Sequence, residues 1–223
     1  MSIKIIGDVH SKYNEYLKIA TSSEYSLQIG DFGLTKEWFK LNYSNLDPNN
    51  HKIIPGNHCS YDLCFNSPYF LGNFGVATLN NISFFFIRGG LSIDRVYRIG
   101  EELSGGPKTY WSQEELNLTE MLECIDLYKQ VKPNIVISHV PAGKFTPYIL
   151  GNKSDETLQK FKFHKGFKEN HQLLGNELLK IHKPKTWISG HMHRSFRENV
   201  DGVDIVALSE LEEYTLIGGE HDK

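Results

Sequence analysis

The sequence predicts a single α/β domain over residues 1–223, on three observations. In the first half, short apolar runs that end in glycine alternate with helix-compatible segments, which requires crossover connections and a sheet covered on its faces. In the second half, Asn80-Asn81 and Asp201-Gly202 are favourable hairpin turns and add antiparallel strands. A chain of 223 residues can bury one substantial core, and no repeat, low-complexity block or break in composition marks a linker.

The first half carries the alternation of strands and helices. We expect strands over residues 3–6, 25–29 and 51–54, each stopped by glycine or by Pro-Gly. Residues 14–20 are compatible with a helix, and Thr35 is placed to cap a second helix through Leu41. These segments would form the parallel part of a sheet.

The second half contains the remaining predicted strands. They cover residues 76–79, 82–87, 135–138, 186–189, 195–200, 203–208 and 214–217. The run Phe84-Phe85-Phe86 fits a core strand better than a surface for stacking bases.

Two helices and two irregular segments complete the second half. Ser112-Gln113-Glu114-Glu115 fits a capping box and predicts that a helix opens at Ser112 and ends before Pro133. A second amphipathic helix is expected over residues 170–182. Residues 89–108 are polar and glycine-rich and predict an irregular surface loop, and residues 140–168 predict loops with a short helix.

The overall composition excludes several classes of protein. With 24 Lys+Arg against 27 Asp+Glu, the net charge of −3 predicts neither a broad attraction to nucleic acid nor binding to an anionic membrane. The three cysteines form no C-x-x-C pair, which argues against a thiolate zinc site and against a disulfide framework. No stretch approaches the roughly 18 apolar residues of a membrane span. We therefore expect a soluble, cytoplasmic protein.

Reactive polar residues follow the predicted strands at the points where the strands end. In open α/β sheets, ligand sites form at the carboxyl ends of strands, so these side chains are expected to meet. They are Asp8 and His10, Asp31, Asn57 and His58, His139, and His191 with His193.

The types and spacing of these residues favour a metal site. Residues two apart in an extended segment project to the same side, so Asp8 and His10 can reach one ion, as can His191 and His193. Imidazole together with carboxylate suits Zn, Fe, Mn or Ni. The ligands are too many for one tetrahedral ion, and two ions sharing the carboxylate of Asp31 would account for them.

The ordered set D-x-H, G-D, G-N-H, H and G-H-x-H resembles the calcineurin-like metallophosphoesterases, and here it extends from Gly7 to His193. The segments 56–62 and 89–95 are similar to a small bacterial and phage branch of that family. The resemblance implies a four-layer α/β/β/α sandwich with two mixed sheets and a binuclear metal centre between the strand ends.

The resemblance also implies a role for each residue. One divalent ion would be held by Asp8, His10, Asp31 and His193, and the other by Asp31, Asn57, His139 and His191. Manganese is favoured among Mn, Fe, Zn and Ni. The two ions would activate a shared water and clamp the phosphoryl oxygens, and His58 would protonate the leaving group as a general acid.

Some positions depart from the phosphoprotein-phosphatase branch of the family. Gly30-Asp31 continues as Phe32-Gly33-Leu34-Thr35, so the Asp and Arg of G-D-x-x-D-R-G are absent, and Pro55 replaces an Arg before G-N-H. Replacement phosphate anchors are therefore sought among Arg88, Arg95, Arg98 and Arg194, with Arg95 preferred, and Asp62 is the candidate to orient His58.

The expected function is metal-dependent hydrolysis of a phosphoric ester. The substrate would be a phosphorylated small molecule, a nucleotide or a phosphoprotein. Two alternatives remain: a non-catalytic scaffold of the same fold that binds a protein partner, and a manganese-dependent nuclease. The histidines without an assigned role are expected to be surface or packing residues, and they are His51, His164, His171, His182 and His221.

Overall fold

The computed structural model describes residues 1–33, 46–151, 160 and 167–218, and it contains two mixed β-sheets. In the first sheet, three parallel strands are joined by an antiparallel strand from the C-terminal part of the chain. The strand order is β10 (Glu213–Ile217), β1 (Ser2–Ile6), β2 (Ser26–Gln28) and β3 (His51–Ile53).

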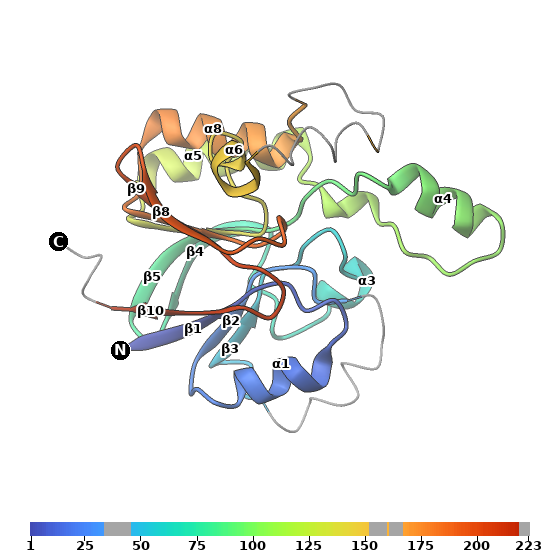
Figure 1. Cartoon of the computed structure of the whole chain (residues 1–223), viewed down its shortest axis with the longest axis horizontal. Coiled ribbons are helices and arrows are strands. Elements are labelled where there is room, and N and C mark those ends of the chain that lie inside the picture. The colour runs from blue at the N-terminus through green and yellow to red at the C-terminus, as the bar shows by residue number, and fades with distance from the viewer. Residues whose placement is uncertain (34–45, 152–159, 161–166, 219–223) are drawn as a thin grey trace.

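The second sheet has a parallel centre and an antiparallel strand at each edge. Its order is β4 (Phe74–Leu79), β5 (Ile82–Ile87), β6 (Ile135–Ser138), β7 (Thr186–Ser189), β9 (Val203–Ala207) and β8 (Phe196–Val200). The carboxyl ends of the parallel strands of both sheets face the same side of the molecule (Figure 1).

Helices cover the outer face of each sheet (Figure 1). The first sheet packs on α1 (Tyr13–Ala20) and the short α3 (Tyr61–Cys64). The second sheet packs on α5 (Leu118–Val131), α6 (Thr146–Leu150) and α8 (Asn170–Ile181).

A third apolar cluster lies between the two sheets and joins, among others, Ile5 and Leu27 of the first sheet to Phe86 and Ile188 of the second. Each sheet therefore has an apolar layer on both faces, which produces the layer order helix, sheet, sheet, helix. The burial of Phe84, Phe85 and Phe86 confirms that this run is a core strand.

The hairpins predicted from Asn80-Asn81 and Asp201-Gly202 are confirmed. All four residues have positive φ, between 47° and 85°, and the flanking strands pair from Leu79 with Ile82 and from Val200 with Val203. Asn, Asp and Gly tolerate this left-handed conformation, which a two-residue turn requires to match the twist of its strands.

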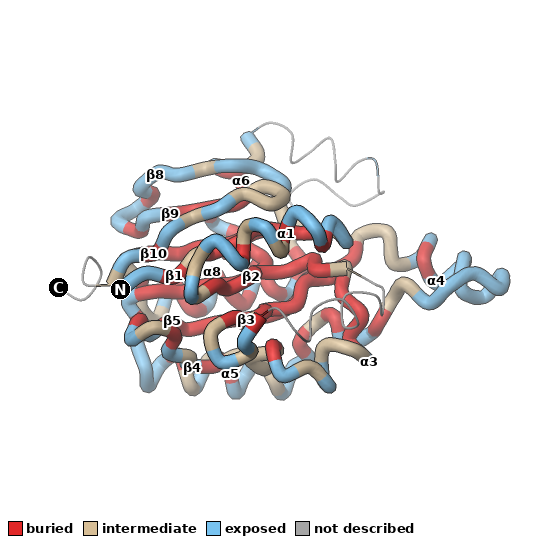
Figure 2. Tube along the Cα trace, turned by 90° about the horizontal axis from the view of Figure 1, so that it is seen from below, coloured by how far each residue is buried: buried red, intermediate tan, exposed pale blue. Residues whose placement is uncertain are grey.

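The prediction of an irregular loop over residues 89–108 is wrong, because α4 (Arg95–Leu103) lies within it. This helix projects from the body and is mostly exposed (Figure 2). Val96 and Leu103 face solvent, whereas the buried residue is Arg98. A pattern in which apolar residues are exposed and an arginine is buried cannot be detected by hydrophobic periodicity.

The predicted start of the next helix is also wrong. Residues Ser112–Glu114 form only a 3-10 turn, η1, and Glu115 is extended. The α-helix begins at Leu118 behind a different capping box, in which the side chain of Asn117 accepts from the Glu120 amide and the Glu120 carboxylate accepts from the Asn117 amide. Glu115, the glutamate of the predicted box, does not cap a helix, because its carboxylate pairs with Arg95 and accepts from the side chain of Asn170.

The remaining expectations concern several parts of the chain. The predicted helix from Thr35 to Leu41 lies outside the described residues, as do His164 and His221. Between residues 140 and 168, α6 is the short helix within the part that is described. Among the described residues, no helix is long and apolar enough to span a bilayer.

Candidate metal centre

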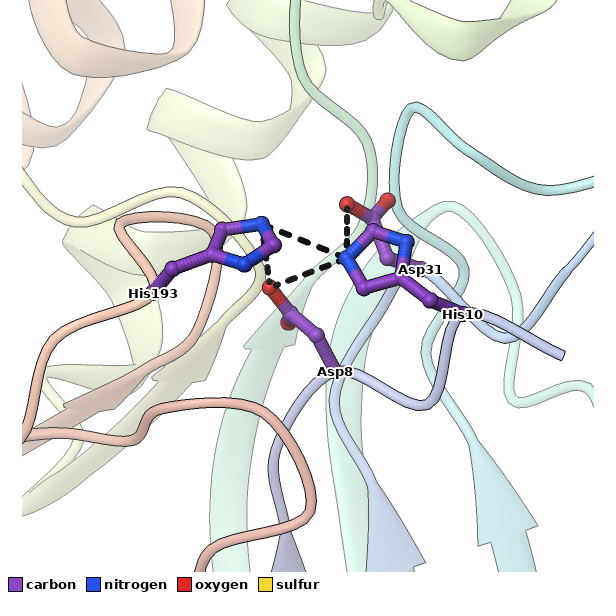
Figure 3. A group of neighbouring side chains, drawn as sticks. All are labelled: Asp8, His10, Asp31 and His193. Atoms are coloured by element: carbon purple, nitrogen blue, oxygen red, sulfur yellow. Dashed lines mark hydrogen bonds and ion pairs between the residues drawn. The ribbon is translucent and has the colours of Figure 1, made fainter. Parts of the chain in front are cut away.

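Four of the predicted ligands converge at the carboxyl ends of β1, β2 and β7. They are Asp8, His10, Asp31 and His193, and their ligand atoms all lie within 4.8 Å of one another (Figure 3). His10 Nε2 lies 3.2 Å from His193 Nε2 and 3.7 Å from Asp31 Oδ2, and His193 Nε2 lies 3.5 Å from Asp8 Oδ2. We call these four residues the first ligand group.

The second ligand group consists of Asp31, Asn57, His139 and His191. His139 Nε2 lies 3.3 Å from Asp31 Oδ1 and 3.1 Å from Asn57 Oδ1. His191 Nδ1 lies 3.0 Å from Asn57 Oδ1 and 3.2 Å from His139 Nε2. One carboxylate oxygen, one amide oxygen and two ring nitrogens therefore face a common point.

Asp31 lies between the two groups and presents a different oxygen to each. Its Oδ2 is on the side of His10, and its Oδ1 is on the side of His139. The amide of His58 also donates to Oδ1 at 2.7 Å, and the amide of His191 donates to Asp8 Oδ2 at 3.1 Å. Each buried carboxylate is thus held in place by the backbone of another motif.

The backbone at these strand ends is unusual. His10, Asp31, His191 and His193 all have positive φ, between 47° and 66°. For residues other than glycine, this conformation costs roughly 1–2 kcal/mol each, and such strain is concentrated at functional sites. The chain turns sharply after each strand, and this brings side chains from separate strands to one point.

Two of the glycines that precede ligands are required by close approach. A Cβ on Gly30, whose φ is +124°, would overlap the ring of His139. A Cβ on Gly190 would overlap the carboxylate of Asp8. The glycines of G-D and G-H-x-H therefore make room for ligands that come from other strands.

The electrostatics of the cluster are dominated by two buried carboxylates beside His139. Burial raises the pKa of Asp8. Burial alone would lower the pKa of His139, but Asp31 and Asp8 outweigh it and raise that pKa to about 10. Burial alone would raise the pKa of Asp31, but the charge of His139 keeps it below its usual value. The imidazolium of His139 supplies positive charge that the carboxylates require.

These residues fit divalent metal ions. Asp8, Asp31 and His139 are each no more than 1 % exposed, and ring nitrogens in both groups face one another at 3.2 Å. A cation bound between two such nitrogens would be coordinated by both once their protons are displaced. His139 Nδ1 donates to the Ile29 carbonyl at 3.0 Å, so the proton that an ion would displace is the one on Nε2, which faces the ligand group.

His58 lines a cavity of about 350 Å³ at the edge of both groups, together with Asp31, Asn57, His191 and His193. The cavity also has apolar walls, provided by Leu91, Ile93, Leu150 and Met192. Arg98 Nη2 lies 2.6 Å from His58 Nδ1. Burial, reinforced by Arg98, lowers the pKa of His58 to about 4.

The structure places the predicted supporting residues differently from our expectation. Asp62 does not face His58; it accepts from Trp111 Nε1 at 2.8 Å and from Lys108 at 3.2 Å. Arg95 pairs with Glu115 at 3.4 Å. Arg98 contacts the ring of His58 and is itself held by Asp94 at 2.9 Å.

Three further residues at the site were not identified from the sequence. Glu169 lies 3.3 Å from His191, Ser92 contacts Asn57, and Glu114 accepts from Ser92. Ser92 lies in the segment 89–95, and the similarity of that segment to the bacterial and phage branch is the signal in the sequence; no motif includes Glu114 or Glu169.

The unassigned histidines within the described part of the chain lie outside the cluster. His51 pairs with Ser26, and His182 contacts the carbonyl of Pro133. His171 is buried, which lowers its pKa to about 4, and its Nε2 accepts from the amide of Leu116. Their interpretation as packing or surface residues is confirmed.

The chain is similar to known proteins over most of its length. The sequence profile of the family described as calcineurin-like phosphoesterase matches residues 1–195. A lariat debranching enzyme of Entamoeba histolytica is 24 % identical over 254 residues, which cover 94 % of this chain and 68 % of that protein.

One of the similar solved structures shows the same fold. A putative 5'-nucleotidase from Staphylococcus aureus superposes with a TM-score of 0.50 at 10 % identity, covering 98 % of this chain and 51 % of that one. A novel archaeal phosphodiesterase matches at 14 % identity with a TM-score of 0.40, covering 97 % and 99 % of the two chains. By the profile match, the chain belongs to the calcineurin-like phosphoesterase family.

Proposed function

From membership of that family and the geometry of the strand ends, we propose that this protein hydrolyses phosphoric esters with two divalent ions. The first ligand group would hold one ion and the second group the other, with Asp31 shared. Manganese is favoured, and iron, zinc and nickel suit the same ligands. The observation that carries the proposal is that the two oxygens of Asp31 face two separate sets of ring nitrogens beside the His58 cavity.

The chemistry divides between the ions and the protein. Bound ions supply Lewis-acid activation of a water and of the phosphoryl group. The protein keeps Asp8 and Asp31 out of water and fixes both with backbone N–H groups, so that the ligands need little reorganisation. The apolar wall formed by Leu91, Ile93 and Met192 limits the entry of further water.

His58 is the proposed general acid. With a pKa of about 4, it is neutral at pH 7 when the cavity is empty. A phosphoryl anion beside it favours the protonated imidazolium. The proton would pass from the ring of His58 to the oxygen of the departing alcohol.

A cation for the phosphoryl oxygens is the next requirement. Arg95, the first residue of α4, is the residue that the sequence favours for binding the phosphoryl oxygens, and it remains a proposal. Arg98 is nearer to the chemistry, because it already contacts His58 and is almost fully buried. Arg88 is excluded, since it is buried against Asn73 and the carbonyl of Gln113.

The proposal includes a class of substrate and is compared with two alternative functions. The substrate is a phosphorylated small molecule, a nucleotide or a phosphoprotein. A manganese-dependent nuclease is the second candidate, and it is supported by the relative that is named a lariat debranching enzyme. A non-catalytic scaffold is disfavoured because every predicted ligand and His58 are present.

We also propose that residues 1–223 form one domain and that the protein is cytoplasmic. The apolar cluster between the sheets includes strands from both ends of the chain, from β1 to β10. Cys59, Cys64 and Cys124 are all free thiols, as expected for a reducing compartment.

The test is hydrolysis of p-nitrophenyl phosphate and of bis(p-nitrophenyl) phosphate by metal-stripped protein to which Mn, Fe, Zn or Ni is added. We expect turnover of at least one ester, and the ratio of the two rates separates monoesterase from diesterase. If neither ester is hydrolysed with any of the four metals, the proposed enzymatic function is wrong.

His58→Ala tests the acid. We expect the variant to bind both ions and to lose about 10²–10⁴-fold in rate on phenyl phosphate, whose leaving group needs a proton. The loss should be smaller on p-nitrophenyl phosphate, which has a better leaving group. His182→Ala is the matched control and should retain the rate. Equal losses for both esters would show that His58 is not the acid.

A further inference from the structure

We propose that Glu169 and the pair Ser92–Glu114 are positioning residues for the second ligand group: Glu169 orients His191, and Ser92 with Glu114 orients Asn57. This inference rests on the proposed two-metal function. It concerns residues that are not ligands: Ser92 lies in the segment 89–95, and Glu114 and Glu169 stand outside every motif named above.

The first part of the inference concerns the ring of His191. Its Nδ1 faces Asn57 and His139, and its Nε2 lies 3.3 Å from Glu169 Oε1. A carboxylate at Nε2 holds the proton there and leaves the lone pair on Nδ1, on the side of the proposed ion. Glu169 is itself 6 % exposed, so water competes little for this contact.

The carboxylate of Glu169 is held from two other directions. It accepts from the amide of Leu91, and it caps α8 by accepting from the amide of the third helical residue, Gln172. The position of the carboxylate beside His191 is therefore fixed by two backbone amides.

The second part concerns the amide of Asn57, whose two ends differ chemically. Its Nδ2 donates to Ser92 Oγ at 3.3 Å, and its Oδ1 faces His139 and His191. Ser92 Oγ in turn donates to Glu114 Oε2 at 3.0 Å, and the Ser92 amide donates to Glu114 Oε1 at 2.8 Å.

The number of protons on each group fixes the direction of these hydrogen bonds. The hydroxyl of Ser92 has one proton, and it donates this proton in a hydrogen bond to Glu114 when that carboxylate is ionised. Ser92 Oγ can then only accept a hydrogen bond from Asn57. The side-chain amide of Asn57 is therefore oriented with its donor Nδ2 at Ser92 and its acceptor Oδ1 at the second ligand group. Asn57, Ser92 and Glu114 are each no more than 3 % exposed, so this order is not disturbed by solvent.

The support of His191 and the support of Asn57 both involve one short segment of the backbone. Leu91 donates its amide to Glu169, and Ser92 donates its amide to Glu114. The segment Leu91–Ser92 thus ties a ligand that follows β3 to a ligand that follows β7, and Leu91 also lines the cavity. Mutation of a residue that orients a metal ligand typically weakens metal affinity by about 10–100-fold.

The experiment for Glu169 is a calorimetric titration of metal-free protein with Mn²⁺. Glu169→Asp keeps the charge and a good helix cap but is too short to reach His191. We expect it and Glu169→Gln to weaken one of the two Mn²⁺ affinities by about 10–100-fold and to leave the other within about threefold. The melting temperature of the metal-free protein is measured in parallel.

The matched control is Glu120→Gln, because Glu120 also takes part in a capping box, that of α5, and contacts none of the ligands. It should leave both Mn²⁺ affinities unchanged. If Glu169→Asp also leaves both unchanged while lowering the melting temperature, Glu169 is only a helix cap and the inference is wrong.

The experiment for Ser92 is a double-mutant cycle with Asn57→Asp. Ser92→Ala should weaken one Mn²⁺ affinity by about 10–100-fold in the parent protein. In the Asn57→Asp background its effect should fall below about threefold, because both ends of a carboxylate are oxygens and no orientation has to be selected. Equal effects in both backgrounds would overturn this part.

Different results would contradict the proposed function and the positioning roles of Glu169 and Ser92. If the parent protein binds no Mn²⁺, the proposed function itself is wrong. If it binds two Mn²⁺ ions and hydrolyses esters, but the Glu169 and Ser92 variants bind both as tightly, the proposed function stands and the positioning inference is wrong.

Discussion

The two ligand groups share Asp31 but differ in their surroundings. In the first group, the side chains of His10 and His193 are 24 % and 48 % exposed. In the second group, His139 is fully buried and His191 is 17 % exposed. The second group is also tied to Ile29, Ser92 and Glu169 by hydrogen bonds and an ion pair.

The difference assigns a separate task to each side of the centre. Exposed ring nitrogens can exchange a protein ligand for water, and so the first group is the side from which solvent reaches the site. Buried, oriented ligands hold an ion with fixed geometry. A binuclear site with one open and one constrained side can admit water without losing its framework.

Removing the shared ligand should have the largest effect. Asp31→Asn takes away one negative charge from both groups, and we expect it to weaken both Mn²⁺ affinities and to lower kcat/KM by at least ~10³-fold, since each metal contributes several kcal/mol to the transition state. Metal content after dialysis and the ester assay measure this. If only one affinity changes, Asp31 is not shared.

The next largest effect is the dependence of metal binding on pH. His139, with a pKa raised to about 10, carries a proton at pH 8, whereas burial lowers the pKa of His10 and leaves it neutral. An ion at the second group must displace the His139 proton, so its affinity should rise about tenfold per pH unit from about pH 7 to 9.

Calorimetry in buffers of different ionisation enthalpy counts the protons released. We expect about one proton for one ion and none for the other at pH 8. The same shift predicts the stability of the metal-free protein. The contribution of His139, with its raised pKa, is complete below about pH 6.5 and is lost as the pH rises through about 10. If both ions release the same number of protons, the proposed difference in protonation between the two ligand groups is wrong.

The smallest expected effect is a difference between two single substitutions. His193→Ala opens a position that water can fill, whereas His139→Ala removes a buried ligand and leaves the Ile29 carbonyl without its donor. His139→Ala should therefore weaken the affected Mn²⁺ affinity about tenfold more than His193→Ala, and it should also destabilise the protein by about 1–3 kcal/mol. Equal losses would remove the distinction between open and buried groups.

The residues that carry the proposed chemistry could be identified from the sequence because the fold exposes them in one place. Asp8, Asp31 and His139 each follow a short apolar strand, and the carboxyl ends of parallel strands meet at one edge. Their position along the chain was therefore enough to predict that they converge. What the convergence does with metal stays a prediction.

The region between residues 89 and 115 could not be understood in the same way. Arg98 and Glu114 are charged residues that the tertiary structure buries, against His58 and Ser92 respectively. A buried charge within a polar segment leaves no periodic signal, and its partner comes from a different part of the chain. Hence the sequence predicts a loop where α4 lies, and it favours Asp62 rather than Arg98 beside His58.

By itself, the sequence determined the order of the strands, the two hairpin turns and the set of residues at the strand ends, because each depends on local periodicity, on turn chemistry or on the general geometry of parallel sheets. Only the tertiary structure decided which oxygen of Asp31 faces which group, how the amide of Asn57 and the ring of His191 are oriented, and which cation meets His58. Those features are set by contacts between residues far apart in the chain. Burial makes such contacts strong, and it gives them no trace in the local sequence.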